Sequence, residues 1–216
     1  MKDRTVRRSL LSLAAFGALA LALAGCGTTL PPAHLYVLNP MPGAAAPSTP
    51  VKATGVRVIG VAPTSVPEYL ERPEIVVRSG ANELTALSGD RWAERLSVNI
   101  SRVLTLNLAA LLPQDTISLI PTAFGQPLDY EVRLVLTEFE LDRSGDATLV
   151  GHWAIADARD SKLLETGNLS LRAHAASGDL PAEVAAMNDN IAAASRAIGA
   201  ALARIEATAP PPSARK

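Results

Sequence analysis

The chain has 216 residues, with 20 lysines and arginines against 21 aspartates and glutamates, a formal net charge of −1 and a single cysteine. Its length fits one domain of the usual size, about 100–200 residues. The charge balance argues against nucleic acid as a partner, because proteins that bind nucleic acid usually carry a basic patch. A single cysteine excludes an internal disulfide framework.

The N-terminus has the pattern of a lipoprotein signal peptide. Four basic residues among the first nine precede an apolar stretch from Leu10 to Ala24. A membrane span needs about 20 apolar residues, so this shorter stretch is typical of a signal peptide. It ends in Leu23-Ala24-Gly25-Cys26, which resembles the bacterial lipobox. We therefore expect cleavage after residue 25 and lipid on the Cys26 thiol. The alternatives are an ordinary signal peptide cut near a chance cysteine, or a signal anchor.

These features divide the chain into four parts. Residues 1–25 are the cleaved signal peptide, and residues 26–52 hold the lipid anchor, a first short strand and a Pro/Ala-rich linker. Residues 53–207 form the main domain, and residues 208–216 a disordered tail that contains three consecutive prolines. Removing residues 1–25 leaves 16 basic and 20 acidic residues, formally −4. With Cys26 lipidated, no thiol remains for a disulfide, a thiolate metal site or a Cys nucleophile.

The first half of the chain predicts strands. Residues 34–38 form a short strand, and residues 40–50 read as an irregular linker. The apolar, β-branched run VRVIGVA over residues 56–62 predicts a buried strand. Residues 75–78 and 83–87 predict a hairpin around a Ser-Gly-Ala-Asn turn.

A long helix follows over residues 91–112. Trp92, Leu96 and Ile100 begin an apolar pattern with spacings of three and four. Asp90 stands where an N-cap belongs, since its carboxylate could accept bonds from free backbone N–H groups. Pro113 ends the helix.

The second half predicts a strand over residues 116–120 and then a three-stranded antiparallel meander. Its strands lie within residues 130–141, 147–155 and 169–173, and their apolar residues alternate. The alternation changes phase before Phe139, which a bulge or a strand buried on both faces would explain.

The last element is a helix over residues 180–207, with Asp179 as its cap and Pro181 in the first turn. Its apolar stripe, from Val184 to Ile205, packs on the sheet or, alternatively, on a coiled-coil partner. The order of elements predicts a two-layer α/β (α+β) domain, with one mixed, mostly antiparallel sheet and two long helices on one face. A strand–helix–strand crossover makes strands 56–62 and 116–120 parallel.

We find no catalytic, cofactor or metal motif in the sequence. His34, His152 and His174 have no ligand spacing, although His152 and His174 could be neighbours in the meander. Glu138 and Glu140 share one strand face, which we interpret as solvated. We therefore expect no catalytic residues, no cofactor and no metal.

The segment from Pro67 to Arg78 is the candidate binding loop. Two prolines stiffen it, and it presents Tyr69 and Arg72 before a strand that ends in Arg78. Aromatic and arginine side chains on a rigid loop are typical anchors for a partner surface. We therefore assign partner binding to Tyr69, Arg72 and Arg78. Alternatively, Tyr69 and the adjacent leucine plug one edge of the core while Arg72 or Arg78 pairs with a local carboxylate.

Three segments resemble the PqiC-like family of ABC-type transport auxiliary lipoproteins. They are HLYVLNP after the lipidated cysteine, the loop VPEYLERPEIVVRSG, and RWAERLSVNISRVLTLNLAALLP at the first long helix. The resemblance extends over roughly residues 35–205. Its most specific parts are the loop at residues 67–78 and the Arg91-Trp92 pair.

The resemblance implies a non-enzymatic role. Members of the family accompany MCE-domain proteins and membrane permeases that move phospholipids between the two membranes of Gram-negative bacteria. The chain would dock the periplasmic MCE assembly at the outer membrane, facing the periplasm. Residue 27 is Gly, not the aspartate associated with retention at the inner membrane.

Other functions and assemblies stay open on the sequence alone. They are a lipid-binding carrier that encloses an acyl chain between helix and sheet, an envelope-assembly lipoprotein with another partner, and a periplasmic enzyme. An edge strand or the C-terminal helix could also support a homo-oligomer.

Overall fold

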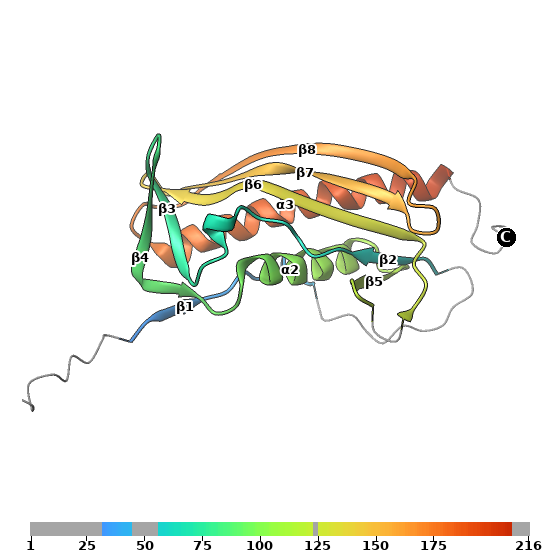
Figure 1. Cartoon of the computed structure of the whole chain (residues 1–216), viewed down its shortest axis with the longest axis horizontal. Coiled ribbons are helices and arrows are strands. Elements are labelled where there is room, and N and C mark those ends of the chain that lie inside the picture. Colours follow the sequence, from blue (N-terminus) through green and yellow to red (C-terminus); the bar gives the residue numbers. More distant parts are fainter. Residues whose placement is uncertain (1–31, 45–55, 123–124, 209–216) are drawn as a thin grey trace, which may run out of the picture. The chain divides into compact units, whose positions relative to one another are not determined.

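The computed structural model describes residues 32–44, 56–122 and 125–208. From Ala33 onward they form one compact unit with a mixed eight-stranded sheet that does not close on itself (Figure 1). The elements in chain order are β1 (His34–Tyr36), β2 (Val58–Val61), the 3-10 turn η1 (Glu68–Leu70), β3 (Glu74–Gly80), β4 (Glu83–Trp92), α2 (Leu96–Leu111), β5 (Thr116–Leu119), β6 (Tyr130–Asp142), β7 (Asp146–Asp157), β8 (Leu163–His174) and α3 (Leu180–Thr208). Neither helix of this described part is long and apolar enough to cross a membrane.

Strand β6 is the centre of the sheet. One of its edges pairs antiparallel with β7 along nearly the whole strand, and β7 pairs in turn with β8. Its other edge is shared, since β2 pairs parallel with Tyr130–Val132 and β3 pairs parallel with Leu141–Asp142. Two branches leave from this edge, β2–β5 and β3–β4–β1. The long pairings are therefore antiparallel and the short ones parallel.

The predicted fold class is confirmed. The meander β6–β7–β8 is present, and β2 and β5 pair parallel on either side of the connection that contains α2. The phase change in β6 is a bulge, because the register with β7 shifts between Leu136 and Glu138. This shift returns Phe139 and Leu141 to the helix-facing side, where both are buried.

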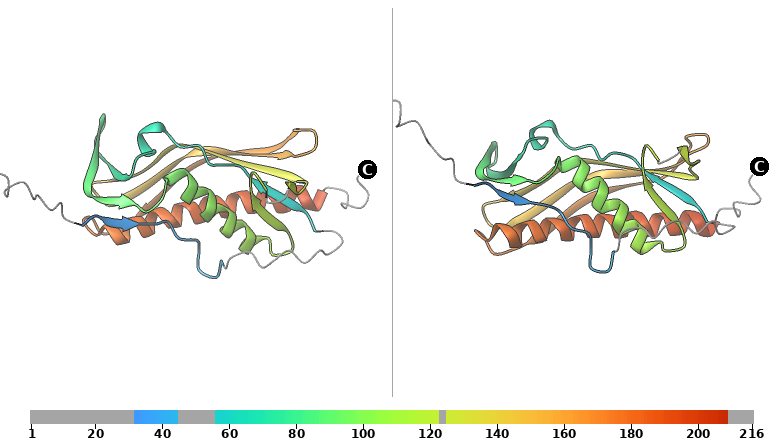
Figure 2. Two further views of the ribbon diagram at one scale, coloured as in Figure 1. Left: turned by 60° about the horizontal axis from the view of Figure 1, so that its bottom comes forward. Right: turned by 90° about the horizontal axis from the view of Figure 1, so that it is seen from below.

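Both helices lie on the same face of the sheet (Figure 2). α3 packs on β6, β7 and β8, and its buried stripe includes Ile191, Ala194, Ile198 and Ala201. The stripe therefore faces the sheet rather than a coiled-coil partner. The predicted cap is confirmed, since the backbone N–H of Ala182 donates to Asp179 Oδ1 at 3.2 Å.

The predicted start of the first long helix is wrong. β4 continues to Trp92, and α2 begins only at Leu96, with Arg95 at its N-cap. Asp90 is a strand residue whose Oδ1 lies 3.2 Å from His34 Nδ1. Parallel pairing with β1 holds residues 90–92 extended. Trp92 is buried from the strand, so it mimics the helical spacing with Leu96 without belonging to the helix.

Buried polar side chains of α2 hold irregular segments of the chain. Asn99 bonds twice to the backbone of Leu38, accepting from its N–H at 2.7 Å and donating to its carbonyl at 3.2 Å. Asn107 accepts from the Met41 N–H at 2.8 Å, and Ser101 Oγ accepts from the Thr64 N–H at 2.8 Å. These bonds satisfy backbone groups that lie outside the sheet ladder.

A glycine in β8 offers a test of the packing between β7 and β8. Gly167 pairs with Trp153, and an added Cβ would lie 2.5 Å from the indole ring. We expect Gly167→Ala to lower the free energy of unfolding by about 1–3 kcal/mol, because the ring must move out of a packed position. Urea unfolding measures the change. The control is Gly89→Ala in β4, where nothing lies within 4 Å of the added Cβ. An equal loss in both variants would contradict the packing explanation.

Candidate partner-binding surface

The predicted binding loop contains the 3-10 turn η1. It closes through backbone bonds from Leu70 N–H to Pro67 C=O at 2.9 Å and from Glu71 N–H to Glu68 C=O at 3.0 Å. Leu70 is buried in the core, whereas Tyr69 is 37% exposed. The loop is thus held in the core by its leucine and presents the tyrosine at the surface.

Tyr69 and Arg78 meet at a buried carboxylate. Tyr69 donates its O–H to Glu140 Oε2 at 3.2 Å, and the Arg78 guanidinium bonds to and pairs with Glu140 Oε1. The Glu140 side chain is only 3% exposed. Arg78 also donates to the Ala81 carbonyl at 3.3 Å. The carboxylate thus joins η1, β3 and β6.

The interpretation of Glu140 as a residue of a solvated face is wrong. Glu140 does face away from Phe139 and Leu141 on β6, but the loop covers that side of the strand with Tyr69 and Arg78. Its neighbour two positions back, Glu138, is half-buried. Strand alternation identifies the face of a side chain correctly, but it does not show that a distant loop returns over that face.

The electrostatics of Tyr69, Arg78 and Glu140 favour a structural role. We call these three residues the Glu140 cluster. Burial, the Glu140 charge and the bond to Glu140 raise the pKa of Tyr69 to about 12. The hydrogen bond to Glu140 raises the pKa of Arg78. At neutral pH the phenol therefore keeps its proton and donates it to the carboxylate, and the guanidinium stays charged. This arrangement fixes the loop against the sheet.

Arg72 lies outside the Glu140 cluster. Its Nε is 3.0 Å from Glu74 Oε2, and its side chain is 49% exposed. Arg91 approaches the other oxygen of Glu74 at 3.9 Å, and Arg95 pairs with Glu71 at 3.3 Å. We call Tyr69, Glu71, Arg72, Glu74, Arg91 and Arg95 the η1 surface. Its charged residues pair locally with alternating sign, and exposed pairs of this kind stabilise a fold little.

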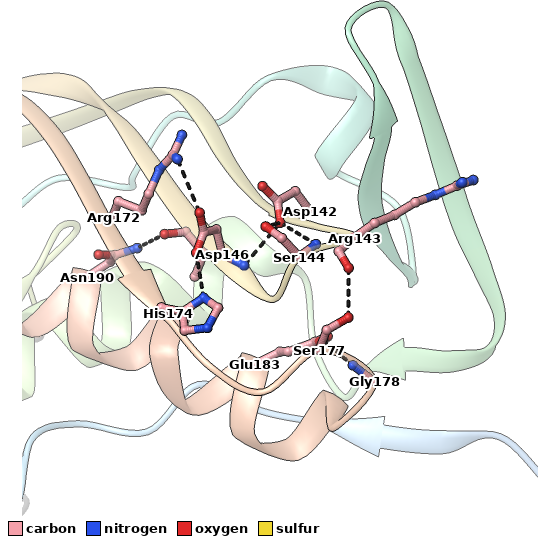
Figure 3. A network of polar contacts seen from close by, with 11 residues as sticks. Asp142, Arg143, Ser144, Asp146, Arg172, His174, Ser177, Gly178, Glu183 and Asn190 are labelled. Atoms are coloured by element: carbon pink, nitrogen blue, oxygen red, sulfur yellow. Dashed lines mark hydrogen bonds and ion pairs between the residues drawn. The ribbon is translucent and has the colours of Figure 1, made fainter.

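A second polar network joins the β6–β7 turn to the start of α3 (Figure 3). Asp146 accepts from Arg172 at 3.1 Å and contacts His174 Nδ1 at 2.7 Å. Ser177 Oγ donates to the Arg143 carbonyl at 2.7 Å. Asn190 Nδ2 donates to the Ala147 carbonyl at 2.8 Å.

Asp142 begins the turn of this network. Burial alone would raise its pKa, but bonds from the Ser144 hydroxyl and from the N–H groups of Asp146 and Ser144 outweigh burial and lower the pKa. The turn is thus stabilised by an ionised carboxylate.

The three histidines lie apart within this sheet. His174 is opposite Asp146, whereas His152 is opposite Asn168 in the middle of the same pairing. His34 lies on β1. In the part of the chain that the structure describes, no group of three or more His, Cys, Asp or Glu residues is placed to hold a metal ion. Cys26, the predicted lipid site, lies outside the described residues.

The Glu140 cluster predicts a loss of stability for Glu140→Gln. The amide keeps the size of the side chain but removes the charge that Arg78 and Tyr69 recognise, so we expect a loss of about 1–3 kcal/mol in the free energy of unfolding. The matched control is Glu138→Gln on the same strand, expected to stay within about 0.5 kcal/mol of the wild type. Urea unfolding compares the two, and equal effects would remove the special role of Glu140.

The raised pKa of Tyr69 predicts a change at alkaline pH. The folded protein holds the phenolic proton more tightly than the unfolded chain does. This contribution is therefore present below the ordinary pKa of 10.0 and is lost as the pH rises towards about 12. We expect the wild type to lose stability relative to Tyr69→Phe over this interval, since phenylalanine has no proton to release. Unfolding free energies measured at a series of pH values test this, and a constant difference would contradict it.

Solved structures with this fold include two that cover most of the chain. A crystal structure of an uncharacterized protein is 18% identical with a TM-score of 0.63, covering 79% of this chain and 99% of that chain. A DUF330-family protein from Xanthomonas campestris is 19% identical with a TM-score of 0.60, covering 77% of this chain and 93% of its own. At these identities the likeness shows the fold. A search of the curated proteins finds no match.

The family model is more informative, because it matches the sequence itself. The model described as "ABC-type transport auxiliary lipoprotein component" matches residues 36–199. This range begins in β1, contains the binding loop and the whole sheet beyond it, and ends in α3. The chain therefore belongs to the family of ABC-type transport auxiliary lipoprotein components.

Proposed function

We propose that this chain is a non-enzymatic lipoprotein of the outer membrane that docks the MCE-domain protein of an ABC-type phospholipid transport system. The family match over residues 36–199 carries the proposal, because it assigns the chain to a transporter assembly and to the cell envelope. The predicted lipid on Cys26 supplies the anchor. Gly27 after that cysteine supports the outer membrane, with the domain facing the periplasm.

The η1 surface is the proposed docking site. Tyrosine and arginine are enriched among the residues that contribute most to binding at protein interfaces. Tyr69 is bonded to Glu140, and Leu70 beside it is buried, so the loop is ordered before any partner arrives. A preordered loop loses little conformational entropy on binding. Arg78 serves this site by holding the Glu140 carboxylate from beneath the loop.

The packing between helix and sheet supports docking over lipid carriage. Large side chains fill the space where a carrier would enclose an acyl chain: Phe139, Leu149, Ile191 and Ile198 are each at most 1% exposed. An acyl chain could enter only by displacing several of these side chains from a close-packed interior.

Substitutions at the η1 surface test the docking site. In a pull-down of the co-expressed MCE-domain protein, we expect Tyr69→Ala and Arg72→Ala each to lower the affinity about tenfold or more, as residues central to an interface do. The matched control is Arg159→Ala, another exposed arginine, which pairs with Asp157 in the β7–β8 turn. Unchanged recovery with both η1 variants would remove this surface from the proposal.

Substitutions near the cysteine test the anchor. Cys26→Ser should move the protein from the membrane fraction to the soluble fraction, because no acyl chain is attached. Gly27→Asp should keep it on a membrane but shift it to the inner one, whereas Thr28→Asp should leave it at the outer membrane. Separation of the two membranes on a density gradient shows the distribution, and an inner-membrane location of the wild type would refute the proposed site of action.

A further inference from the structure

Strand β1 and the residue after it present apolar side chains to the outside. Tyr36 and Leu38 point inward, and Leu38 is fully buried. Leu35 and Val37 alternate with them and are 68% and 37% exposed. Among the large apolar side chains that the structure describes, Leu35 is the most exposed. Exposing a leucine to this extent costs free energy that contact with an apolar phase would recover.

The backbone around β1 is fixed, so these side chains cannot turn inward. Parallel pairing places Leu35 beside Arg91 and Tyr36 beside Trp92. The Tyr36 carbonyl accepts from the Ala93 N–H at 2.8 Å, and Asn99 holds the backbone of Leu38. A slip of one residue would bury Leu35 only by exposing Leu38. The outward position of Leu35 and Val37 is therefore a property of the folded domain.

The chain length before β1 limits how far this strand can lie from the membrane. Leu35 follows Cys26 by nine residues. A fully extended chain spans at most about 3.6 Å per residue, so Leu35 stays within about 32 Å of the lipidated cysteine. Leu163 is another exposed leucine on an edge strand, but it comes 128 residues after Leu35. The short stretch of chain after Cys26 therefore sets no such limit on its distance from the cysteine.

We propose that β1 and Val37, directly after it, rest on the bilayer surface, with the Leu35 and Val37 side chains in the boundary between headgroups and acyl chains. Arg91 is opposite Leu35 in the strand pairing and 47% exposed, so this one residue of the η1 surface then lies at the edge of that surface, beside the lipid phosphates. The contact gives the membrane a second hold on the protein beside the lipid anchor and fixes the orientation of the domain. It rests on the proposed lipidation of Cys26, and it does not depend on the identity of the protein partner.

A reporter on a single thiol tests the contact in the full-length, acylated protein. Cys26 is the only natural cysteine and is consumed by lipid, so Leu35→Cys or Val37→Cys provides one free thiol for an environment-sensitive fluorophore. The matched control is Leu163→Cys on β8, where the native side chain is 59% exposed. The proteins are placed in vesicles of phosphatidylethanolamine and phosphatidylglycerol that contain lipids with a spin label near the headgroup.

We expect a blue-shifted emission and several times stronger quenching by the spin-labelled lipid at positions 35 and 37 than at position 163. Equal quenching at all three positions would overturn the proposal. Shielding of position 35 from aqueous iodide without quenching by lipid would also overturn it, because a second copy or another protein would then cover β1. Adding Leu35→Asp to the Val37→Cys protein should weaken the quenching at position 37, and Leu163→Asp should not.

The outcome separates this proposal from the proposed function. Mass spectrometry of the same sample shows whether Cys26 carries acyl chains. Unacylated protein would overturn both the anchor and the membrane contact. Acylated protein without quenching at position 35 would overturn the contact alone and leave docking through the η1 surface standing.

Discussion

The shared edge of β6 is the constraint on which the rest of the molecule depends. β2, Ser65 and β3 follow one another along this edge in the same direction, at Ile59–Val61, at the bridge to Val135 and at Val77–Arg78. Between Ser65 and Val77 the outer chain uses 12 residues where β6 uses six, from Val135 to Leu141. The excess must leave the sheet, and η1 is part of it. The candidate binding surface is therefore a consequence of how two strands divide one edge.

A loop that leaves the sheet has to be held by side chains, because it loses the ladder of backbone bonds. Glu140 holds η1 through Tyr69 and Arg78. Ser101 of α2 holds the segment between β2 and η1 by accepting from the Thr64 N–H. Asn99 and Asn107 of α2 do the same for the segment that follows β1. In these irregular segments, side-chain bonds thus replace the backbone bonds of the sheet. Such a surface suits the proposed docking role, because it is formed before the partner binds.

Periodicity in the sequence was sufficient for most of the elements and for the layer arrangement. The meander, the C-terminal helix and the parallel pair β2–β5 follow from alternation, capping and the crossover rule. The start of α2 did not follow, because Trp92 has helical spacing to Leu96 while its backbone pairs with β1. Long-range pairing decided that boundary, and a local pattern contains no information about it.

The sequence singled out the residues of the candidate site but not the contacts that hold them. Proline spacing and residue type singled out Tyr69, Arg72 and Arg78, yet only two of them share a partner. That partner, Glu140, lies 71 residues after Tyr69 and 62 residues after Arg78, on a face that alternation assigns to solvent. Asn99, Ser101 and Asn107 occupy buried positions of α2, and the apolar pattern that predicts this helix does not include them. Their signal was present all the same, since amides and hydroxyls at core-facing helical positions require a hydrogen-bonding partner.

The proposed lipid anchor at Cys26 lies only nine residues before Leu35 of β1, so its position bears on how the rigid domain is oriented. A lipid anchor alone would not fix the orientation of the domain, and a rigid docking surface would then meet its partner in random orientation. β1 pairs with β4, and the segment that follows β1 is bonded to Asn99 of α2. Through Arg91 and Glu74, β4 connects in turn to Arg72 of the η1 surface. A membrane contact at β1 would therefore set the orientation of the η1 surface through a short chain of fixed strands, and the entropy of orienting the domain would be spent at the membrane before the partner arrives.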